Sequence, residues 1–109
     1  MTVKELEESL GLTPVYLSNP DREVTGAYVG DLLSWVMGRA PADSAWLTIM
    51  SNVNVCAVAS LADVACVILA EGVTPDPPAK TAAETRGLNM FTSSKTSYQL
   101  AKELALLGI

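Results

Sequence analysis

Trp46-Leu47-Thr48-Ile49-Met50 is an apolar run that leads directly into the small polar residues Ser51-Asn52. The same pattern occurs twice more, where residues 64–70 lead into Glu71-Gly72 and residues 88–92 lead into Ser93-Ser94-Lys95. Each run has the length of a buried strand, and a segment of helical character follows it. This alternation predicts an α/β fold, a small three-layer open sheet that is mostly parallel, with helices on both faces. Ligands bind such sheets beyond the carboxyl ends of the strands.

The remaining segments extend the same arrangement. Thr2 and Glu5 form a capping-box pattern before an amphipathic helix that Gly11 ends. Asp31 is expected to cap a short helix that stops at Gly38. Segment 53–62 has both strand and helix formers, and we expect a helix because two parallel strands need a crossover. Expected helices are 3–10, 32–37, 53–62, 79–86 and 95–107, and expected strands are 14–17, 23–29 (with a bulge or a close backbone approach at Gly26), 46–50, 64–70 and 88–92.

Length and charge limit the function classes. The 109 residues predict a single domain over 1–109, and the net charge of −5 with scattered basic residues argues against nucleic acid and anionic membranes as partners. No apolar stretch approaches the roughly 20 residues of a spanning helix, and the start lacks a signal-peptide pattern. We therefore expect a cytoplasmic protein. A modest core and 50% hydrophobic residues favour self-association.

The sequence offers little for catalysis. It contains no His, and Cys56 and Cys66 are ten residues apart in apolar segments, which predicts two buried, reduced thiols. No nucleophile–base set and no metal-ligand spacing can be assigned. We expect no cofactor, no metal and no enzymatic activity, so a binding or regulatory role is favoured.

Candidate ligand residues are the polar side chains at the three strand ends. The turn 93–97 has the Lys-Thr pair of a P-loop without its glycines, so it either caps the last helix alone or also contacts an anion. The two Asn residues after the first strand end either cap a helix or bind a ligand, and Glu71 is either solvated or part of the same pocket. The charged stretch Asp21-Arg22-Glu23 is expected to be a solvated turn. The candidate site residues are Asn52, Asn54, Glu71, Ser94, Lys95 and Thr96.

A family resemblance covers nearly the whole chain. It rests on residues 21–26 leading to 29–33, on Ala57-Val58-Ala59-Ser60-Leu61 before an apolar strand and Gly72, and on Pro75-Asp76 with the final helix. With these motifs the chain resembles a stand-alone DRTGG domain, a module similar to the amino-terminal domain of HPr kinase/phosphorylase. The positions of the family's own signature fall near residues 51–54 and 70–72, at two of the strand ends, where this chain departs from it and only Gly72 agrees. The resemblance implies a regulatory, often dimer-forming role without the P-loop domain that carries the kinase chemistry.

Three hypotheses follow. The leading one is a non-catalytic regulatory module that self-associates and senses a small anionic or nucleotide ligand, or contacts a partner protein. The second is a pure interaction subunit for a partner enzyme. The third is an accessory or degenerate phosphotransfer protein, in which a partner kinase would phosphorylate Ser94 or Thr96.

Overall fold

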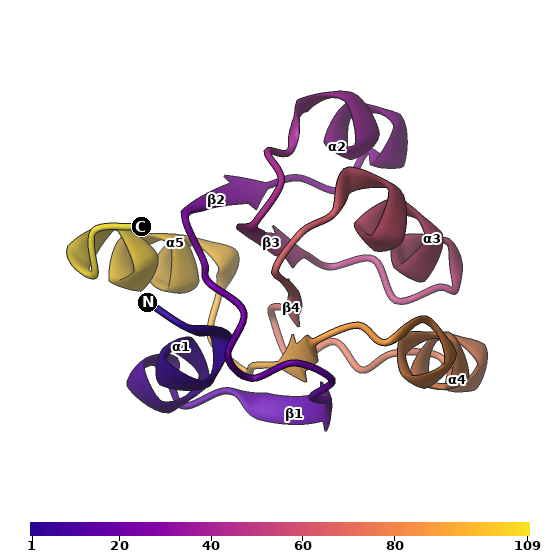
Figure 1. The fold of residues 1–109 in the computed structure, drawn as a ribbon, viewed down its shortest axis with the longest axis horizontal. Coiled ribbons are helices and arrows are strands. Elements are labelled where there is room, and N and C mark those ends of the chain that lie inside the picture. Colours follow the sequence, from indigo (N-terminus) through magenta and orange to yellow (C-terminus); the bar gives the residue numbers. More distant parts are fainter.

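A five-stranded sheet lies between two layers of helices in the computed structural model, which describes all residues 1–109 (Figure 1). The strand order is β1-β5-β4-β3-β2, in which β2, β3, β4 and β5 are parallel and β1 runs antiparallel to β5 at the edge. The predicted open, mostly parallel sheet is confirmed. The strands are β1 (Thr13–Tyr16), β2 (Gly26–Val29), β3 (Ser44–Thr48), β4 (Cys66–Leu69) and β5 (Met90–Thr92).

The helices cover both faces of the sheet, as predicted. Figure 1 shows α1 and α5 on one face and α2, α3 and α4 on the other. The order α-β-β-α-β-α-β-α-β-α is the one expected from the sequence, and no helix has the length and apolar character needed to cross a membrane. The helices are α1 (Val3–Leu10), α2 (Leu33–Arg39), α3 (Asn54–Ala62), α4 (Pro77–Arg86) and α5 (Ser97–Leu106).

Each face of the sheet has its own core because successive strand residues point to opposite faces. In β3, Leu47 packs in the cluster under α1 and α5, whereas Trp46 packs in the cluster under the other three helices. Both faces of β3 and β4 are therefore buried, which explains why these strands read as continuous apolar runs. Cys56 and Cys66 are buried free thiols in opposite clusters, as predicted.

The structure corrects two expectations near β2. The predicted strand 23–29 is shortened to Gly26–Val29, because Val24 donates its N–H to the Met1 carbonyl instead of to a strand. Asp31 does not cap α2, whose N-cap is Leu32 without a side-chain bond, and α2 continues through Gly38 to Arg39. The Asp31 carboxylate instead accepts bonds from the Thr48 hydroxyl (2.8 Å) and the Ile49 N–H (2.9 Å).

The observed helix ends agree with the predicted ones where the capping residue is close to the helix in the sequence. Thr2 and Glu5 form both bonds of the capping box, and Gly11 ends α1 at a φ of 63°. Helix α4 begins at Pro77, two residues earlier than expected, because proline fits the first turn of a helix. Helix α5 begins at Ser97 and not at residue 95, because Thr96 is its N-cap.

Candidate functional site

The three predicted strand ends meet at one edge of the sheet. Because β3, β4 and β5 are parallel neighbours, their carboxyl ends lie side by side. Backbone bonds then tie the following loops together: Glu71 donates its N–H to the Lys95 carbonyl (2.8 Å), and Asp76 donates its N–H to the Ser51 carbonyl (2.9 Å). The Ser51 hydroxyl also donates to the Asp76 carboxylate at 3.2 Å.

At the end of β5, the predicted residues serve the fold. The Thr96 hydroxyl accepts the Gln99 N–H at 3.1 Å, and the Glu71 carboxylate accepts the Ser97 N–H at 2.9 Å. The position where an external anion would sit at the start of α5 therefore holds the chain's own carboxylate. Lys95 donates to the Leu10 carbonyl (2.9 Å) and pairs with a Glu103 oxygen (3.0 Å).

At the end of β3, Asn52 and Asn54 form a separate group. The Asn52 side-chain oxygen accepts the Asn54 N–H at 2.9 Å, which closes the turn before α3. The side chains of Asn54 and Ser94 are exposed. The structure thus brings Glu71 and residues 94–96 together and leaves the two Asn residues in the neighbouring loop. Ligand contact by these six residues stays a prediction.

The same edge has a hollow of about 280 Å³, which we call the β5 hollow. Strand β1 runs antiparallel to β5, so β1 begins where β5 ends, and Thr13 lies opposite Thr92. The loop before α4 closes the third side. The pairing of β1 shifts register between Pro14 and Tyr16, and such bulges are frequent next to binding sites. The hollow is lined by Thr13, Pro14, Val15, Thr74, Pro75, Lys80 and Thr92.

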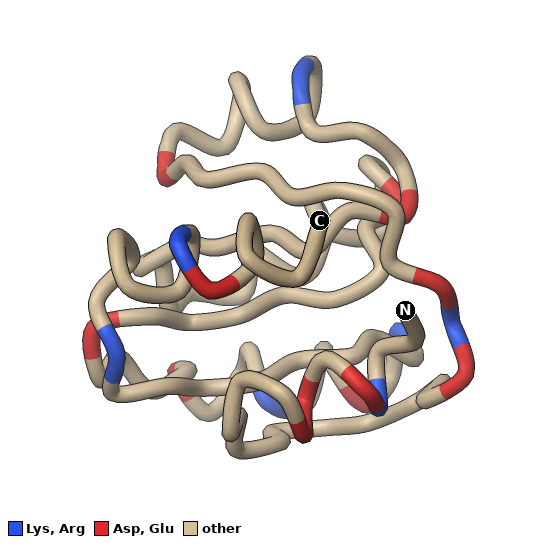
Figure 2. Tube along the Cα trace, turned by 90° about the vertical axis from the view of Figure 1, so that its left-hand side faces the viewer, with Lys and Arg blue, Asp and Glu red and all other residues tan.

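The lining of the β5 hollow is basic and hydroxylated in an acidic protein. Lys80 is its one charged residue, no carboxylate lines it, and Lys80 forms no ion pair. Most other cations in the chain are compensated: three of them pair with carboxylates, and Arg39 stacks on the Trp35 ring at 3.8 Å. Figure 2 shows that the basic positions are dispersed along the trace. An uncompensated lysine among threonine hydroxyls is suited to an anion.

The sequence analysis did not identify this hollow. Lys80 was expected only as part of the helix 79–86, and Thr74 was not singled out. Thr92 was the available signal, because it ends the third predicted strand. The sequence did not show where β1 lies in the sheet. Its antiparallel pairing with β5 puts Thr13 beside the end of β5.

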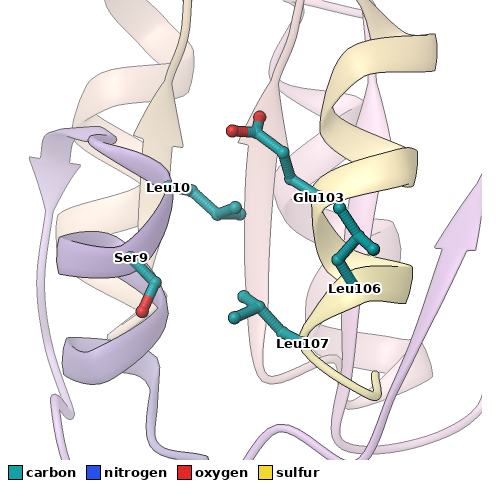
Figure 3. Close-up of a pocket in the computed structure, with 5 residues that line it drawn as sticks. All are labelled: Ser9, Leu10, Glu103, Leu106 and Leu107. Carbon is teal, nitrogen blue, oxygen red and sulfur yellow. The ribbon is translucent and has the colours of Figure 1, made fainter.

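A second, more apolar groove lies between α1 and α5 (Figure 3). Its volume is about 180 Å³. In Figure 3, Leu10 and Leu107 point toward each other from the two sides, and the Glu103 carboxylate points toward α1. One Glu103 oxygen binds Lys95, whereas the other is buried without a partner. The groove is completed by Ser9 and Leu106.

Arg22 has several charged partners, as the residues of a functional site often do, but its role is structural. Contrary to the expected solvated turn, the Arg22 side chain is only 26% exposed, and its guanidinium donates to Asp43 (2.9 Å), the Asp63 carboxylate (2.9 Å) and the Asp63 carbonyl (2.7 Å). Burial works to lower the pKa of Arg22, but the hydrogen bonds and charges of the two aspartates outweigh it, and the net pKa is raised. Asp43 precedes β3 and Asp63 ends α3, so this cluster lies at the opposite edge from the strand ends.

Comparisons with known proteins show a similar fold in a solved structure. No protein-family model and no curated protein matches the sequence. Among solved structures, the chain is similar to the CBS and DRTGG domains of the regulatory region of Clostridium perfringens pyrophosphatase, in complex with the activator diadenosine tetraphosphate. The TM-score is 0.76 at 10% identity, over 94% of this chain and 45% of that one. The chain thus spans less than half of that structure, and the likeness shows a shared fold.

Proposed function

We propose that residues 1–109 form one non-catalytic regulatory module of the DRTGG type, which senses a small anionic ligand at the β5 hollow. The observation that carries the proposal is the uncompensated Lys80 in a hollow at the carboxyl edge of a parallel sheet. In this reading the module is a cytoplasmic homodimer related to the amino-terminal domain of HPr kinase/phosphorylase, and it acts on a partner enzyme.

The fold likeness supports a sensing role. The matched Clostridium perfringens region is regulatory and was seen with a nucleotide activator. A regulator needs an element whose position a ligand can change. Strand β1 fits this role, because it is a bulged edge strand with a single neighbouring strand in the sheet, and the hollow lies between it and α4. A ligand that bridges Thr13 and Lys80 would hold β1 against α4.

A thermal-shift screen tests the proposal. The probes are adenine and guanine nucleotides, inorganic phosphate, phosphorylated metabolites and acetyl phosphate. A ligand at 100 times its dissociation constant stabilises the folded state by roughly 2.7 kcal/mol, which is a shift of several degrees in a domain of this size. We expect at least one phosphorylated probe to raise the melting temperature. A transition that none of the probes moves would contradict ligand sensing.

An exposed apolar surface favours a second candidate, the interaction subunit. It consists of exposed apolar side chains on β2, α2 and the loop after β3, and bonds of Asp31 tie the start of α2 to that loop. Several large apolar side chains exposed on neighbouring elements of a small protein are typical of an interface. Its residues are Val29, Leu32, Trp35, Met37, Ile49 and Val53, each at least 44% exposed.

The oligomeric state of the protein shows whether this surface joins two copies of the chain or binds a different partner protein. Leu32→Ser removes one of its members, and Leu61→Ser is the matched control because Leu61 is an exposed leucine on α3 outside it. If the surface joins two copies, analytical ultracentrifugation will show a dimer that only Leu32→Ser dissociates. A monomeric wild-type chain would leave the surface free for a different partner protein and would remove the homodimer from the proposal.

A further inference from the structure

We propose that the β5 hollow recognises a single phosphate group, either free phosphate or a phosphomonoester, and that it discriminates against polyphosphates. This inference rests on the proposed function and narrows it to a ligand chemistry. It differs from what the fold likeness alone would lead one to expect, because the Clostridium perfringens region was seen with a tetraphosphate.

Charge limits the number of phosphate groups. Lys80 supplies one positive charge at the hollow, and no carboxylate in the lining opposes an anion there. Beyond the hollow, the net charge of −5 repels further phosphates. The other cations without an ion pair are Arg39, which stacks on Trp35, Arg86, at the far end of α4, and Lys102 on α5. Arg86 lies six positions after Lys80 in the helix, which is roughly 9 Å along the axis and away from the strand ends.

The backbone amides at the start of α4 cannot supply the hydrogen bonds to a bound phosphate, so other donors of the hollow must do so. Pro77 and Pro78 open α4 and have no N–H, whereas the next two amides, of Ala79 and Lys80, both donate to the Asp76 carbonyl (2.8 and 3.2 Å). The start of this helix therefore offers no free donor to an anion. The available donors are the Lys80 ammonium, the threonine hydroxyls and the N–H of Thr74, a loop residue whose amide has no acceptor within the chain. The hydroxyls in the lining belong to Thr13, Thr74 and Thr92.

The size and walls of the hollow fit a small ligand. A volume of about 280 Å³ lies just below the usual range of small-molecule pockets. Pro14, Val15 and Pro75 give it three apolar walls, against which the organic part of a phosphomonoester would lie. A dinucleoside polyphosphate is too large for this volume, and it carries more negative charge than Lys80 balances.

Titration calorimetry tests the inference with four probes: inorganic phosphate, AMP, ATP and diadenosine tetraphosphate. We expect phosphate and AMP to bind, and neither polyphosphate to bind more tightly than AMP. Equal affinity for phosphate and AMP would mean that the hollow recognises only the phosphate group. Tighter binding of AMP would mean that the apolar walls contribute to the affinity. Either result supports a single-phosphate site.

Three variants locate the site. Lys80→Ala should weaken phosphate binding by about tenfold or more, because it removes a charge-assisted hydrogen bond. Lys102→Ala is the matched control, an unpaired lysine elsewhere on the surface, and should change the affinity by less than about twofold. Thr13→Val removes one hydroxyl with little change of shape and should weaken binding by several-fold. The melting temperature of each variant confirms that it folds.

The outcomes separate this inference from the proposed function. If ATP or diadenosine tetraphosphate binds more tightly than AMP, the single-phosphate inference is wrong while ligand sensing stands. The inference is equally wrong if phosphate binds Lys80→Ala as well as the wild type, since the site then lies elsewhere. If no probe binds the wild-type chain, the proposed function and the inference fall together.

Discussion

The carboxylate of Glu71 accepts a hydrogen bond from the backbone N–H of Ser97 at 2.9 Å. A residue from the end of β4 thus stabilises the beginning of α5, where a negative charge is favoured by the free amides and by the helix dipole. Glu71 makes this contact from a backbone φ of 63°, a region that is costly for a residue with a side chain. The contact stabilises the packing of the β4 loop on α5 and leaves no room there for an external anion.

Two substitutions at Glu71 separate the contact from the backbone strain. Glu71→Ala removes the carboxylate but keeps the strained φ, so we expect the free energy of unfolding to fall by about 1–2 kcal/mol. Glu71→Gly removes both, and it should be less destabilising than Glu71→Ala by roughly 1 kcal/mol. Urea denaturation measures the difference. If the alanine variant were the more stable of the two, the φ of 63° would not be a source of strain.

Lys95 is expected to matter for stability and not for ligand binding. Its ammonium contacts the Leu10 carbonyl and Glu103, and its side chain is 35% exposed, so Lys95→Ala should cost about 1–2 kcal/mol. The shift in melting temperature produced by phosphate should be unchanged, because Lys95 does not line the β5 hollow. Lys102→Ala is the control for the stability effect. A loss of the phosphate shift in Lys95→Ala would place the ligand at the start of α5 instead.

The parts of the fold that depend on local patterns could be predicted from the sequence. The capping box of α1, the helix-ending Gly11 and the apolar runs of β3 and β4 each require only neighbouring residues. Asp31 was wrongly expected to cap α2 because its actual partner, the buried hydroxyl of Thr48, is seventeen residues away. Long-range partners of this kind are not visible in local spacing.

The site was predictable only in part, for the same reason. The rule that ligands bind beyond the strand ends points to the edge of the sheet at which the proposed β5 hollow also lies. It could not show that the carboxylate of Glu71 and the ammonium of Lys95 are already engaged by the chain itself. Nor could it show that Thr13, seventy-nine positions from Thr92, lies opposite it across an antiparallel pair.

Asn89 should be among the most sensitive polar residues. Its buried amide uses all of its main bonding capacity: the oxygen accepts the N–H groups of Ser18 and Asn19, and the nitrogen donates to the carbonyls of Asn19 and Ala65, all at 2.8–3.0 Å. Asn89→Asp keeps the acceptor but places a carboxylate against two carbonyl oxygens. We expect a loss of about 2–4 kcal/mol at pH 7, and a smaller loss near pH 4, where protonation restores one donor.

Asn52→Asp is the matched control for that variant. The Asn52 side chain acts only as an acceptor, for the Asn54 N–H at the start of α3. An aspartate at position 52 therefore preserves this hydrogen bond. This change should alter the free energy of unfolding by less than about 0.5 kcal/mol. Equal losses in the two variants would mean that the two donor bonds of Asn89 contribute little.

Cys66 should make the stability of the protein fall at alkaline pH. Burial raises the pKa of its thiol to about 12, although the charge of Arg22 acts in the opposite direction. The unfolded chain releases this proton near its ordinary pKa of 9.0, whereas the folded chain retains it. Stability is therefore complete below pH 9 and falls by at most about 1.4 kcal/mol per pH unit between pH 9 and 12.

The variant Cys66→Ala removes this proton and isolates its effect. Urea denaturation at several values between pH 8 and 11 should give a flatter loss of stability for Cys66→Ala than for the wild type, even though the variant starts from a lower value because it leaves a cavity. Lysine and tyrosine also titrate in this range, but they are common to both proteins and cancel in the difference. Parallel curves would mean that the Cys66 thiol is accessible to water, which would in turn require β4 to open at a cost far below that of global unfolding.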